Sequence, residues 1–298
     1  MSQQPTHVVF LGTSGFAVPS LEALALDPAF KIELVVTQPD KPMGRKQILT
    51  PPAVKVAAEE LELRIFQPQN INLELLSALN SQFAIRNSQF LVVVSYGQIL
   101  SQELLDLPAI APVNVHASLL PRFRGASPIQ HAILSGDGET GVTIQQMVKE
   151  LDAGPIVAQE RTVIGDRETF SVLHDRLAAM GASLLVRTLS NALHPTPQSD
   201  ALATRCPKLT REDGIVDPNI ITAEEIDRRV RALVPWPGVS LTVDNNVIKI
   251  LVTSLEHSSE SFPLPCKDGT MLYLVSVQPP GKKPMSGEAW NRGMRGKK

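Results

Sequence analysis

The sequence predicts an α/β protein in which a mostly parallel, Rossmann-like sheet is followed by a small OB-like β-barrel domain. The chain opens with an apolar run, a Gly-rich turn and a helical segment, as α/β units do. The later run Ile32–Thr37 is typical of a strand in a sheet covered on both faces, and Phe90–Ser95 is the most strongly β-like run in the chain. After residue 207 the pattern changes to short β-like runs around one amphipathic helix, which favours a small barrel.

The composition limits the class of protein. A chain of 298 residues suffices for one large or two ordinary domains. The net charge of -2 shows no global excess of cations for nucleic acid, and Cys206 and Cys266 lack metal-ligand spacing. The sequence shows neither a signal peptide nor an apolar run of roughly 18 residues. We therefore expect a soluble cytoplasmic protein (bacterial cytosol or organelle interior) with reduced thiols and no membrane partner.

Elements of the first domain follow in order. Strands are predicted at His7–Leu11, Ile32–Thr37, Phe90–Ser95, Val113–His116, Val142–Met147 and Ile156–Ile164. Helices are predicted at residues 16–25, 53–63, 73–79, 127–134 and 170–193. Gly12 and Gly15 in the first turn could bind phosphate at a helix N-terminus. The full dinucleotide fingerprint is absent, so tight-turn glycines are the favoured interpretation.

We assign residues 1–190 to the catalytic domain, 191–207 to a linker and 208–298 to the C-terminal domain. The linker is rich in Pro and cannot sustain a helix or a sheet. Beyond it we predict a helix at Ala223–Leu233 and strands at Val239–Val243, Val247–Val252 and Met271–Val277. A solvated, frayed end is the usual interpretation of the basic tail after Pro279, and the sequence leaves open whether this tail is ordered.

The stretch VNVHASLLPRFRGASPIQ, residues 113–130, carries the strongest chemical signal. Asn114 and His116 are two residues apart on a predicted strand, so their side chains share one face. An amide can donate a hydrogen bond to a developing negative charge, and an imidazole can carry a proton near neutral pH. A lone histidine would more often fill a strand end; the loop that follows and Asp152 in the turn LDAGP favour a catalytic site.

A second motif is the segment QPDKPMGRKQILTPP, residues 38–52, which we predict to be a loop broken by proline. It holds the cations Lys41, Arg45 and Lys46, which could meet a phosphate backbone. Taken alone, it would be interpreted as a solvated surface loop.

The motifs HASLLPRFRGASPIQ and LDAGPI together resemble the signature of folate-dependent formyltransferases. The segments FLGTSGFAVPSLEAL, VVTQPDKPMGRK, VVSYGQIL, GVTIQQM and VQPPGKKPMSGEAW are similar to the members that act on initiator methionyl-tRNA. The resemblance implies a metal-free enzyme that transfers a formyl group from 10-formyltetrahydrofolate to the methionyl amine. We expect it to work as a monomer.

The resemblance also implies site residues. The catalytic positions of the family fall on Asn114, His116 and Asp152. Its folate-binding positions fall on Tyr96, Gly97, Gln98, Ile99, Leu100, Ser118, Leu119, Leu120 and Pro121. The tRNA-binding positions are Lys41, Arg45, Lys46, Lys282 and Lys283, and no metal ligands are implied. The sequence departs from the family pattern in a shorter basic loop, in Arg205-Cys206-Pro207 and at Pro218, which bear on tRNA contact rather than on catalysis.

Two alternatives remain open from the residues. A formyltransferase acting on a small amine, such as a glycinamide ribonucleotide or an amino-sugar nucleotide, would share Asn114, His116 and Asp152. It would leave the basic loop and the second domain without a purpose. A non-catalytic nucleotide- or folate-binding module would not need these three side chains together.

Overall fold

The computed structural model describes residues 4–44, 46–79, 88–243 and 246–295. The chain forms two compact units. The first comprises residues 1–125, 140–162 and 174–205, and the second comprises residues 126–139, 163–173 and 206–298. The predicted boundaries at residues 190 and 208 remain a prediction.

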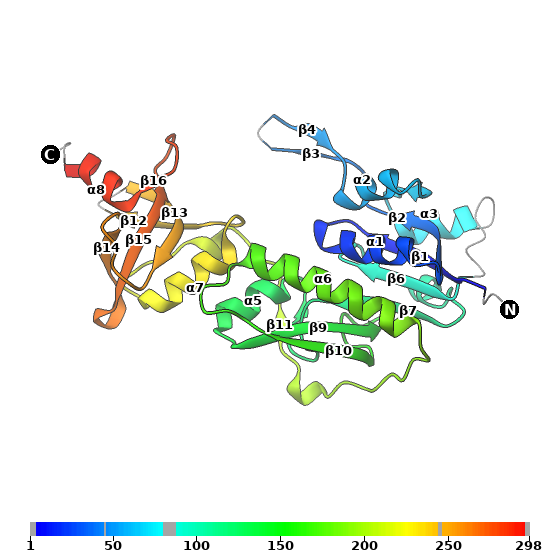
Figure 1. Ribbon diagram of the computed structural model, residues 1–298. Coiled ribbons are helices and arrows are strands. Elements are labelled where there is room, and N and C mark those ends of the chain that lie inside the picture. Colours follow the sequence, from blue (N-terminus) through cyan, green and yellow to red (C-terminus); the bar gives the residue numbers. More distant parts are fainter. Residues whose placement is uncertain (1–3, 45, 80–87, 244–245, 296–298) are drawn as a thin grey trace. The chain divides into compact units, whose positions relative to one another are not determined.

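The first unit is built on a seven-stranded sheet with the strand order β10-β9-β7-β6-β1-β2-β5 (Figure 1). Its strands are β1 (Thr6–Gly12), β2 (Phe30–Val36), β5 (Ile65–Phe66), β6 (Phe90–Val94), β7 (Ala111–His116), β9 (Glu139–Gln146) and β10 (Ile156–Val163). β1 pairs in parallel with β2 and β6, and β7 pairs in parallel with β6. β9 runs antiparallel to β7. The predicted mostly parallel α/β sheet is therefore confirmed.

The two faces of this sheet carry alternate residues of each strand. On one face Val9, Leu11, Leu91 and Val93 belong to a buried cluster that also contains residues of α3 (Ile71–Leu79) and α4 (Gln102–Leu105). Burying these aliphatic side chains is the main stabilising contribution, at roughly 1.5–3 kcal/mol for each large side chain. This face also carries the chemical site.

Helices cover the opposite face. They include α1 (Val18–Leu26), α2 (Ala53–Glu60) and α6 (Phe170–Leu189), which lies over the sheet in Figure 1. A Cβ atom at Gly181 of α6 would lie 2.8 Å from Val115 of β7, so this helix approaches the sheet closely at a glycine. Gly12 is also a packing glycine, because a Cβ there would lie 2.8 Å from the Phe10 ring and 2.9 Å from Ala17.

The basic segment of residues 38–52 is not the loop that the sequence predicted. It contains an antiparallel pair of short strands, β3 (Lys41–Met43) and β4 (Ile48–Thr50), which projects from the first unit in Figure 1. Pro42 does not prevent this pairing, because both strands of a two-stranded ribbon are edge strands, where proline is tolerated. Lys55 and Gln67 bind the Asp40 carboxylate at the base of the ribbon.

The second unit holds an antiparallel sheet with the order β12-β13-β15-β14, with β16 also paired to β15. Its strands are β12 (Val239–Val243), β13 (Asn246–Ser254), β14 (Phe262–Pro265), β15 (Met271–Gln278) and β16 (Met285–Ser286). The unit also contains α5 (Pro128–Ser135) and α7 (Ala223–Leu233), and α7 begins with a capping box between Thr222 and Glu225. The predicted C-terminal β domain is confirmed.

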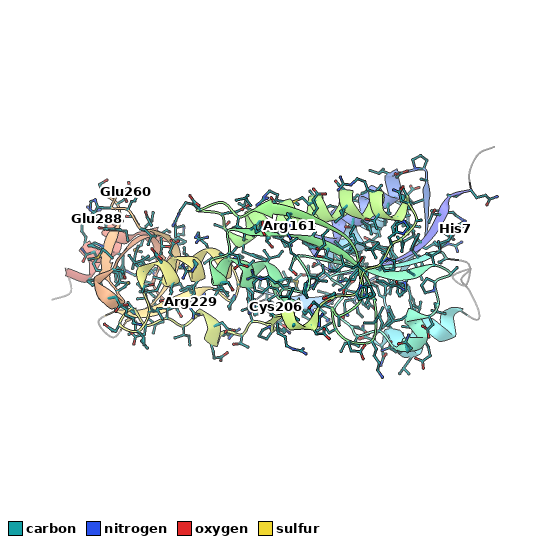
Figure 2. The ribbon with its side chains drawn as sticks, turned by 90° about the horizontal axis from the view of Figure 1, so that it is seen from below. His7, Arg161, Cys206, Arg229, Glu260 and Glu288 are labelled. Atoms are coloured by element: carbon teal, nitrogen blue, oxygen red, sulfur yellow. The ribbon has the colours of Figure 1, made fainter. Side chains whose placement is uncertain are left out.

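Residues 287–295 form a helix, which answers for these residues the question of order that the sequence left open. α8 (Gly287–Arg295) buries Trp290, whose ring meets Phe262 edge-on at a centroid distance of 5.2 Å. The N–H of Glu288 donates to the carbonyl of Glu260 at 3.0 Å, and the two residues lie side by side in Figure 2. Aromatic burial therefore orders a segment whose local composition is basic.

Several short helices and strands lie between the elements named above. They are η1 (Gly15–Ala17), β8 (Arg124–Gly125), η3 (Asp200–Leu202), β11 (Arg205–Cys206), η4 (Glu212–Gly214) and η5 (Lys267–Gly269). Among the described helices, none combines the length and the apolar composition that a membrane span requires.

Candidate active site

The site is organised by the register between β7 and β9. Asn114 pairs with Gln145, and His116 pairs with Thr143. Side chains of directly opposed residues lie on the same face of a sheet. Asn114 also pairs with Val93 of β6, so all these polar side chains lie on the face that α3 and α4 cover.

His116 is 6% exposed and is fixed through its Nε2 atom. Its Nε2 lies 2.9 Å from the carbonyl oxygen of Phe123. A carbonyl can only accept a hydrogen bond, which assigns a proton to Nε2. The Nδ1 atom faces Asp152 at 3.7 Å from Oδ1. Nδ1 is therefore the atom of His116 available for proton transfer.

Asp152 is held by two donors other than the histidine. Its Oδ2 accepts the N–H of Gly125 at 2.8 Å, and its Oδ1 accepts the side-chain amide of Gln145 at 3.0 Å. The backbone turns sharply here, since Asp152 has a φ of 53°. A Cβ on Gly154 would lie 1.8 Å from the carbonyl oxygen of Gln146, so only glycine fits that position. The turn that carries Asp152 therefore requires glycine at position 154.

Gln198 supports the same turn from the segment predicted as a linker. Its side-chain nitrogen donates to the carbonyls of Asp152 at 2.9 Å and Gly154 at 2.6 Å. Its Oε1 accepts a hydrogen bond from Arg124 at 3.0 Å, and Arg124 also pairs with Asp200. The linker residues therefore contribute to the shape of the site.

A cavity of about 110 Å³ adjoins Asp152. It is lined by Gln98, Ile99, Leu100, Leu105, Gln145, Met147, Val148, Lys149, Glu150, Leu151 and Asp152. Ile99 and Leu151 are 77% and 63% exposed. A small apolar cavity with a polar end and exposed aliphatic side chains suits a flat ring with polar edges.

Part of the predicted folate segment lines this cavity and part does not. Gln98, Ile99 and Leu100 are lining residues, whereas Tyr96 and Gly97 are not. Gly97 has a φ of 90° and forms the turn after β6. Asn72 of α3 fixes the segment by bonding the carbonyl of Ile99 and the N–H of Ser101.

Tyr96 lies in the hydrophobic cluster instead, with 2% exposure. Its hydroxyl has no hydrogen-bond partner among the described residues. Burial, with a smaller contribution from the charge of Glu74, raises the pKa of the Tyr96 phenol far above its usual value of 10. Tyr96 therefore remains neutral under all physiological conditions.

The segment Ser118 to Pro121 lies between His116 and Phe123 and forms an internal network. The Ser118 hydroxyl donates to the carbonyl of Arg122, while the Ser118 carbonyl accepts the hydroxyl of Thr143. Leu120 donates its N–H to the same hydroxyl at 3.1 Å. None of Ser118, Leu119, Leu120 or Pro121 lines the 110 Å³ cavity, so their predicted contact with folate stays a prediction.

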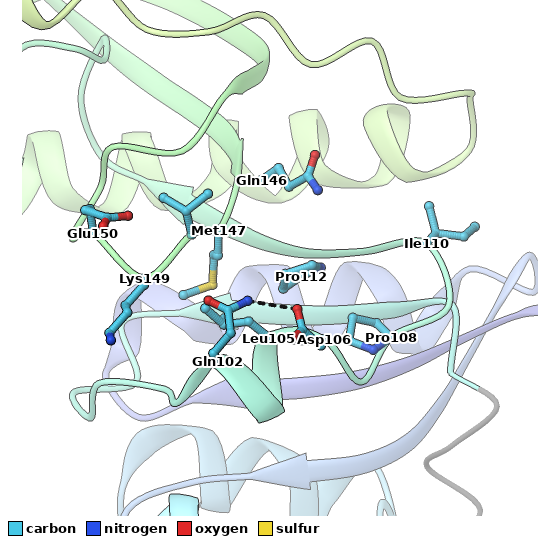
Figure 3. A pocket seen from close by; sticks show the side chains of 11 residues that line it. Gln102, Leu105, Asp106, Pro108, Ile110, Pro112, Gln146, Met147, Lys149 and Glu150 are labelled. Carbon is cyan, nitrogen blue, oxygen red and sulfur yellow. Dashed lines mark hydrogen bonds between the residues drawn. The ribbon is translucent and has the colours of Figure 1, made fainter.

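A larger depression of about 590 Å³ shares Leu105, Met147, Val148, Lys149 and Glu150 with the small cavity (Figure 3). Gln102 donates to Asp106 at 2.8 Å along its wall. Figure 3 shows the side chains of Gln146 and Met147 pointing apart, as neighbours on a strand do.

The predicted tRNA-binding residues lie in both units. In the first unit, Lys41 and Lys46 are exposed on the β3/β4 ribbon, and Lys41 also donates to Gln38. Arg45 lies outside the described residues. Lys282 and Lys283 are exposed in the turn between β15 and β16. Within the described part of the chain, no cluster of His, Cys, Asp and Glu could hold a metal ion.

Sequence reasoning missed three supporting residues, namely Gly125, Gln145 and Gln198. The period-two alternation of GVTIQQM would have placed Gln145 beside Asn114 if the pairing of these strands had been known. No local signal marks Gly125 or Gln198, because their partners lie 27 and 46 residues away.

Comparison with known families agrees with this fold. Residues 6–189 match the family described as formyl transferase. Residues 208–295 match the family described as formyl transferase, C-terminal domain. The chain therefore belongs to the formyltransferase family, and the resemblance of its motifs is confirmed.

The relatives narrow the family further. The methionyl-tRNA formyltransferase of Nitratidesulfovibrio vulgaris strain DP4 is 42% identical, over 96% of this chain and 92% of that protein. The methionyl-tRNA formyltransferase of Gluconobacter oxydans is 40% identical, over 96% of both chains.

Solved structures share the fold at lower identity. An N-formyltransferase from Helicobacter canadensis, in complex with folinic acid and dTDP-3-aminofucose, has a TM-score of 0.65 and 19% identity. The match covers 91% of this chain and 98% of that one. HypX from Aquifex aeolicus in complex with tetrahydrofolic acid has a TM-score of 0.63 and 14% identity, covering 98% of this chain and 47% of that one. The chain thus spans about half of HypX.

Proposed function

We propose that this protein transfers the formyl group of 10-formyltetrahydrofolate to the α-amino group of initiator methionyl-tRNA, giving formylmethionyl-tRNA for translation initiation. The observation that carries the proposal is an identity of about 40% to methionyl-tRNA formyltransferases over nearly the full length of the chain. Asn114 and His116 share one face of β7, and His116 faces Asp152. We also expect it to act as a monomer in the cytosol, where initiator tRNA is used.

The residues suit this chemistry. An amine that attacks a formyl carbon forms a C–N bond, and negative charge develops on the formyl oxygen. The amide of Asn114 can donate to that oxygen, and Nδ1 of His116 can donate to it once that nitrogen carries a proton, because donors positioned in a partly buried site need little reorganisation. The bond from the formyl carbon to the folate nitrogen then breaks, and tetrahydrofolate leaves.

Proton movement falls to Asp152 and His116. The attacking amine must lose a proton, and the departing folate nitrogen must gain one. Asp152 lies 3.7 Å from His116 Nδ1, so the two can exchange a proton directly after a small movement or through one water. The Gly125 N–H and the Gln145 side-chain amide hold the Asp152 carboxylate in place beside His116.

The 110 Å³ cavity fits the ring end of the folate. Its wall combines aliphatic residues such as Ile99 and Leu100 with the amides of Gln98 and Gln145. A ring bound there would lie next to Asp152, which closes one end of the cavity. This arrangement would place the attached formyl group near the proton-transfer residues.

The test is a formylation assay with purified protein, radiolabelled 10-formyltetrahydrofolate and charged initiator tRNA. We expect label to appear in formylmethionine released from the tRNA, and none with uncharged tRNA. Absence of transfer by folded protein that binds folate would refute the proposed activity.

A further inference from the structure

The hydrogen bonds that the structure gives the Asp152 carboxylate come from residues other than the proposed catalytic residues Asn114 and His116. Gln145 is one of them, and its side-chain nitrogen lies 3.0 Å from Oδ1. Gln145 is only 2% exposed and stands directly opposite Asn114 across the β7–β9 pair. Gln145 therefore bonds Asp152 and lies beside Asn114, both of which are proposed catalytic residues.

The orientation of the Gln145 amide is dictated by charge. If the amide were reversed, its oxygen would face the carboxylate oxygen of Asp152, and two acceptors would meet. With the nitrogen toward Asp152, the Oε1 atom is buried and has no hydrogen-bond partner among the described residues. Oε1 is shielded from solvent, so the bond from the amide nitrogen to Asp152 is the described hydrogen bond that fixes this side chain.

We propose that Gln145 is a positioning residue for the formyl transfer, which fixes the Asp152 carboxylate against His116 through its side-chain N–H. This inference rests on the proposed function. Gln145 acts through Asp152, and its amide nitrogen does not touch the reacting atoms. The sequence alone assigns it no role.

The charged groups around Asp152 define what Gln145 can change. His116 faces it from β7 at 3.7 Å, and Lys149 and Glu150 precede it in the same turn. Arg124 is next to Gly125, but its guanidinium is engaged with Asp200 and Gln198. Gln145 and the Gly125 N–H are therefore the neutral donors that stabilise the carboxylate, and only Gln145 can be removed by a side-chain change.

The test uses three substitutions at one position. Gln145→Met keeps the length and removes the donor, Gln145→Glu replaces the donor by a second carboxylate, and Gln145→His offers a ring N–H. We expect kcat to fall about 10- to 100-fold in Gln145→Met, because misplacing a catalytic group is costly. Gln145→Glu should lose more, and Gln145→His should recover part of the activity. Gln146→Met is the matched control, because successive side chains of a β-strand point to opposite faces.

The decisive readouts are the split between kcat and KM and the position of the Asp152 carboxylate. Removing the Gln145 donor should lower kcat while the KM for folate changes less than about twofold, because Gln145 acts through Asp152. A crystal structure of Gln145→Met measures the distance from Asp152 Oδ1 to His116 Nδ1 without any assay of activity, and we expect it to differ from the 3.7 Å of the wild type. An unmoved Asp152 carboxylate in Gln145→Met, or a change confined to the KM for folate, would overturn the proposal. If wild type showed no formyl transfer, the proposed function would fail while the structural comparison would still decide the role of Gln145.

Folding is monitored in the same samples by thermal unfolding. If Gln145→Met did not fold, the smaller change Gln145→His would carry the test. Its ring N–H should bond Asp152, keep the carboxylate in its wild-type position and recover part of the activity that Gln145→Met loses. A folded Gln145→His whose ring N–H bonds Asp152 in a crystal structure, but whose kcat is as low as that of Gln145→Glu, would contradict the role of the donor.

Discussion

Oδ1 of Asp152 lies 3.7 Å from Nδ1 of His116, which is close enough for electrostatic coupling but too far for a hydrogen bond. The two groups are fixed separately. His116 is anchored through Nε2 to the carbonyl of Phe123, and Asp152 through Gly125 and Gln145. A proton can therefore pass between them by a small shift or through one water, without dismantling either anchor.

Removing either member of the Asn114–His116 pair should abolish most of the turnover. We expect Asn114→Ala and His116→Ala each to reduce kcat by roughly 100- to 1,000-fold, because each loses stabilisation of the developing charge. Steady-state formylation measures the effect. His174→Ala is the control, since His174 lies on α6 and pairs with Asp175. Near-normal turnover in a folded Asn114 or His116 variant would remove that residue from the mechanism.

Asp152→Asn should impair proton transfer more than folate binding. The substitution preserves size and loses the negative charge that faces His116. We expect kcat to fall by at least about tenfold across the range of about pH 6 to 9, because the carboxylate that accepts the proton is lost. The KM for folate should change less than about twofold, since one residue of a larger cavity wall is altered only in charge. Unchanged kcat across this range would leave Asp152 with a structural role alone.

The exposed lysines of the β3/β4 ribbon provide a test of the tRNA contact. Neutralising Lys41 and Lys46 together should weaken tRNA binding and reduce the salt dependence by about one to two units of slope, because each phosphate contact releases counterions. Binding is measured by filter retention over a series of salt concentrations. Folate binding should not change, because neither lysine lines the cavity next to Asp152.

Lys31→Gln is the control for that experiment, since Lys31 is an exposed lysine of the same unit that pairs with Glu33. An equal loss of tRNA affinity in Lys31→Gln would indicate a general effect of charge. Equal slopes for wild type and the double variant would exclude the ribbon from the tRNA interface.

The buried phenol of Tyr96 should make the folded protein less stable at high pH. Burial raises the pKa of its phenol, so the folded protein holds the proton after the unfolded chain has released it. This contribution is fully present below about pH 10, the pKa in the unfolded chain, and declines as the pH rises through the higher folded pKa. The free energy of unfolding should therefore fall above about pH 10.

Tyr96→Phe should remove this part of the alkaline loss. It also deletes a buried hydroxyl without a partner among the described residues, so stability at pH 8 should be equal or higher. Urea unfolding at pH 8 and pH 10.5 makes the comparison, with half-buried Tyr273→Phe as the control. A lower stability of Tyr96→Phe at both pH values would show that the hydroxyl has a stabilising partner.

The sequence predicted the framework because apolar periodicity is local. The strand at Val113–His116 and the helix at Ala223–Leu233 could be placed from their own residues and their flanking turn signals. The β3/β4 ribbon and α8 could not, because cross-strand pairing and the contact of Trp290 with Phe262 depend on distant residues. Local composition favoured a loop and a frayed end at these two places.

The candidate site was predictable to the same extent. Motifs identified Asn114, His116 and Asp152, but not the atoms that hold them. Gln145 becomes visible only when β9 is paired antiparallel with β7, and Gly125 only when the Asp152 turn folds back on it. Tyr96 lies in the motif VVSYGQIL, yet the fold places its ring in the core next to α3 and α4.

The enzyme is defined by the amine that accepts the formyl group, and competition between acceptor amines measures this preference. The measurement is kcat/KM for charged initiator tRNA, glycinamide ribonucleotide and a dTDP-amino sugar, each with 10-formyltetrahydrofolate under one buffer condition. We predict that charged initiator tRNA is preferred by at least about 1,000-fold, because only a large acceptor can contact surfaces beyond the amine itself. A kcat/KM for either small amine that equals or exceeds the value for the tRNA would contradict the account.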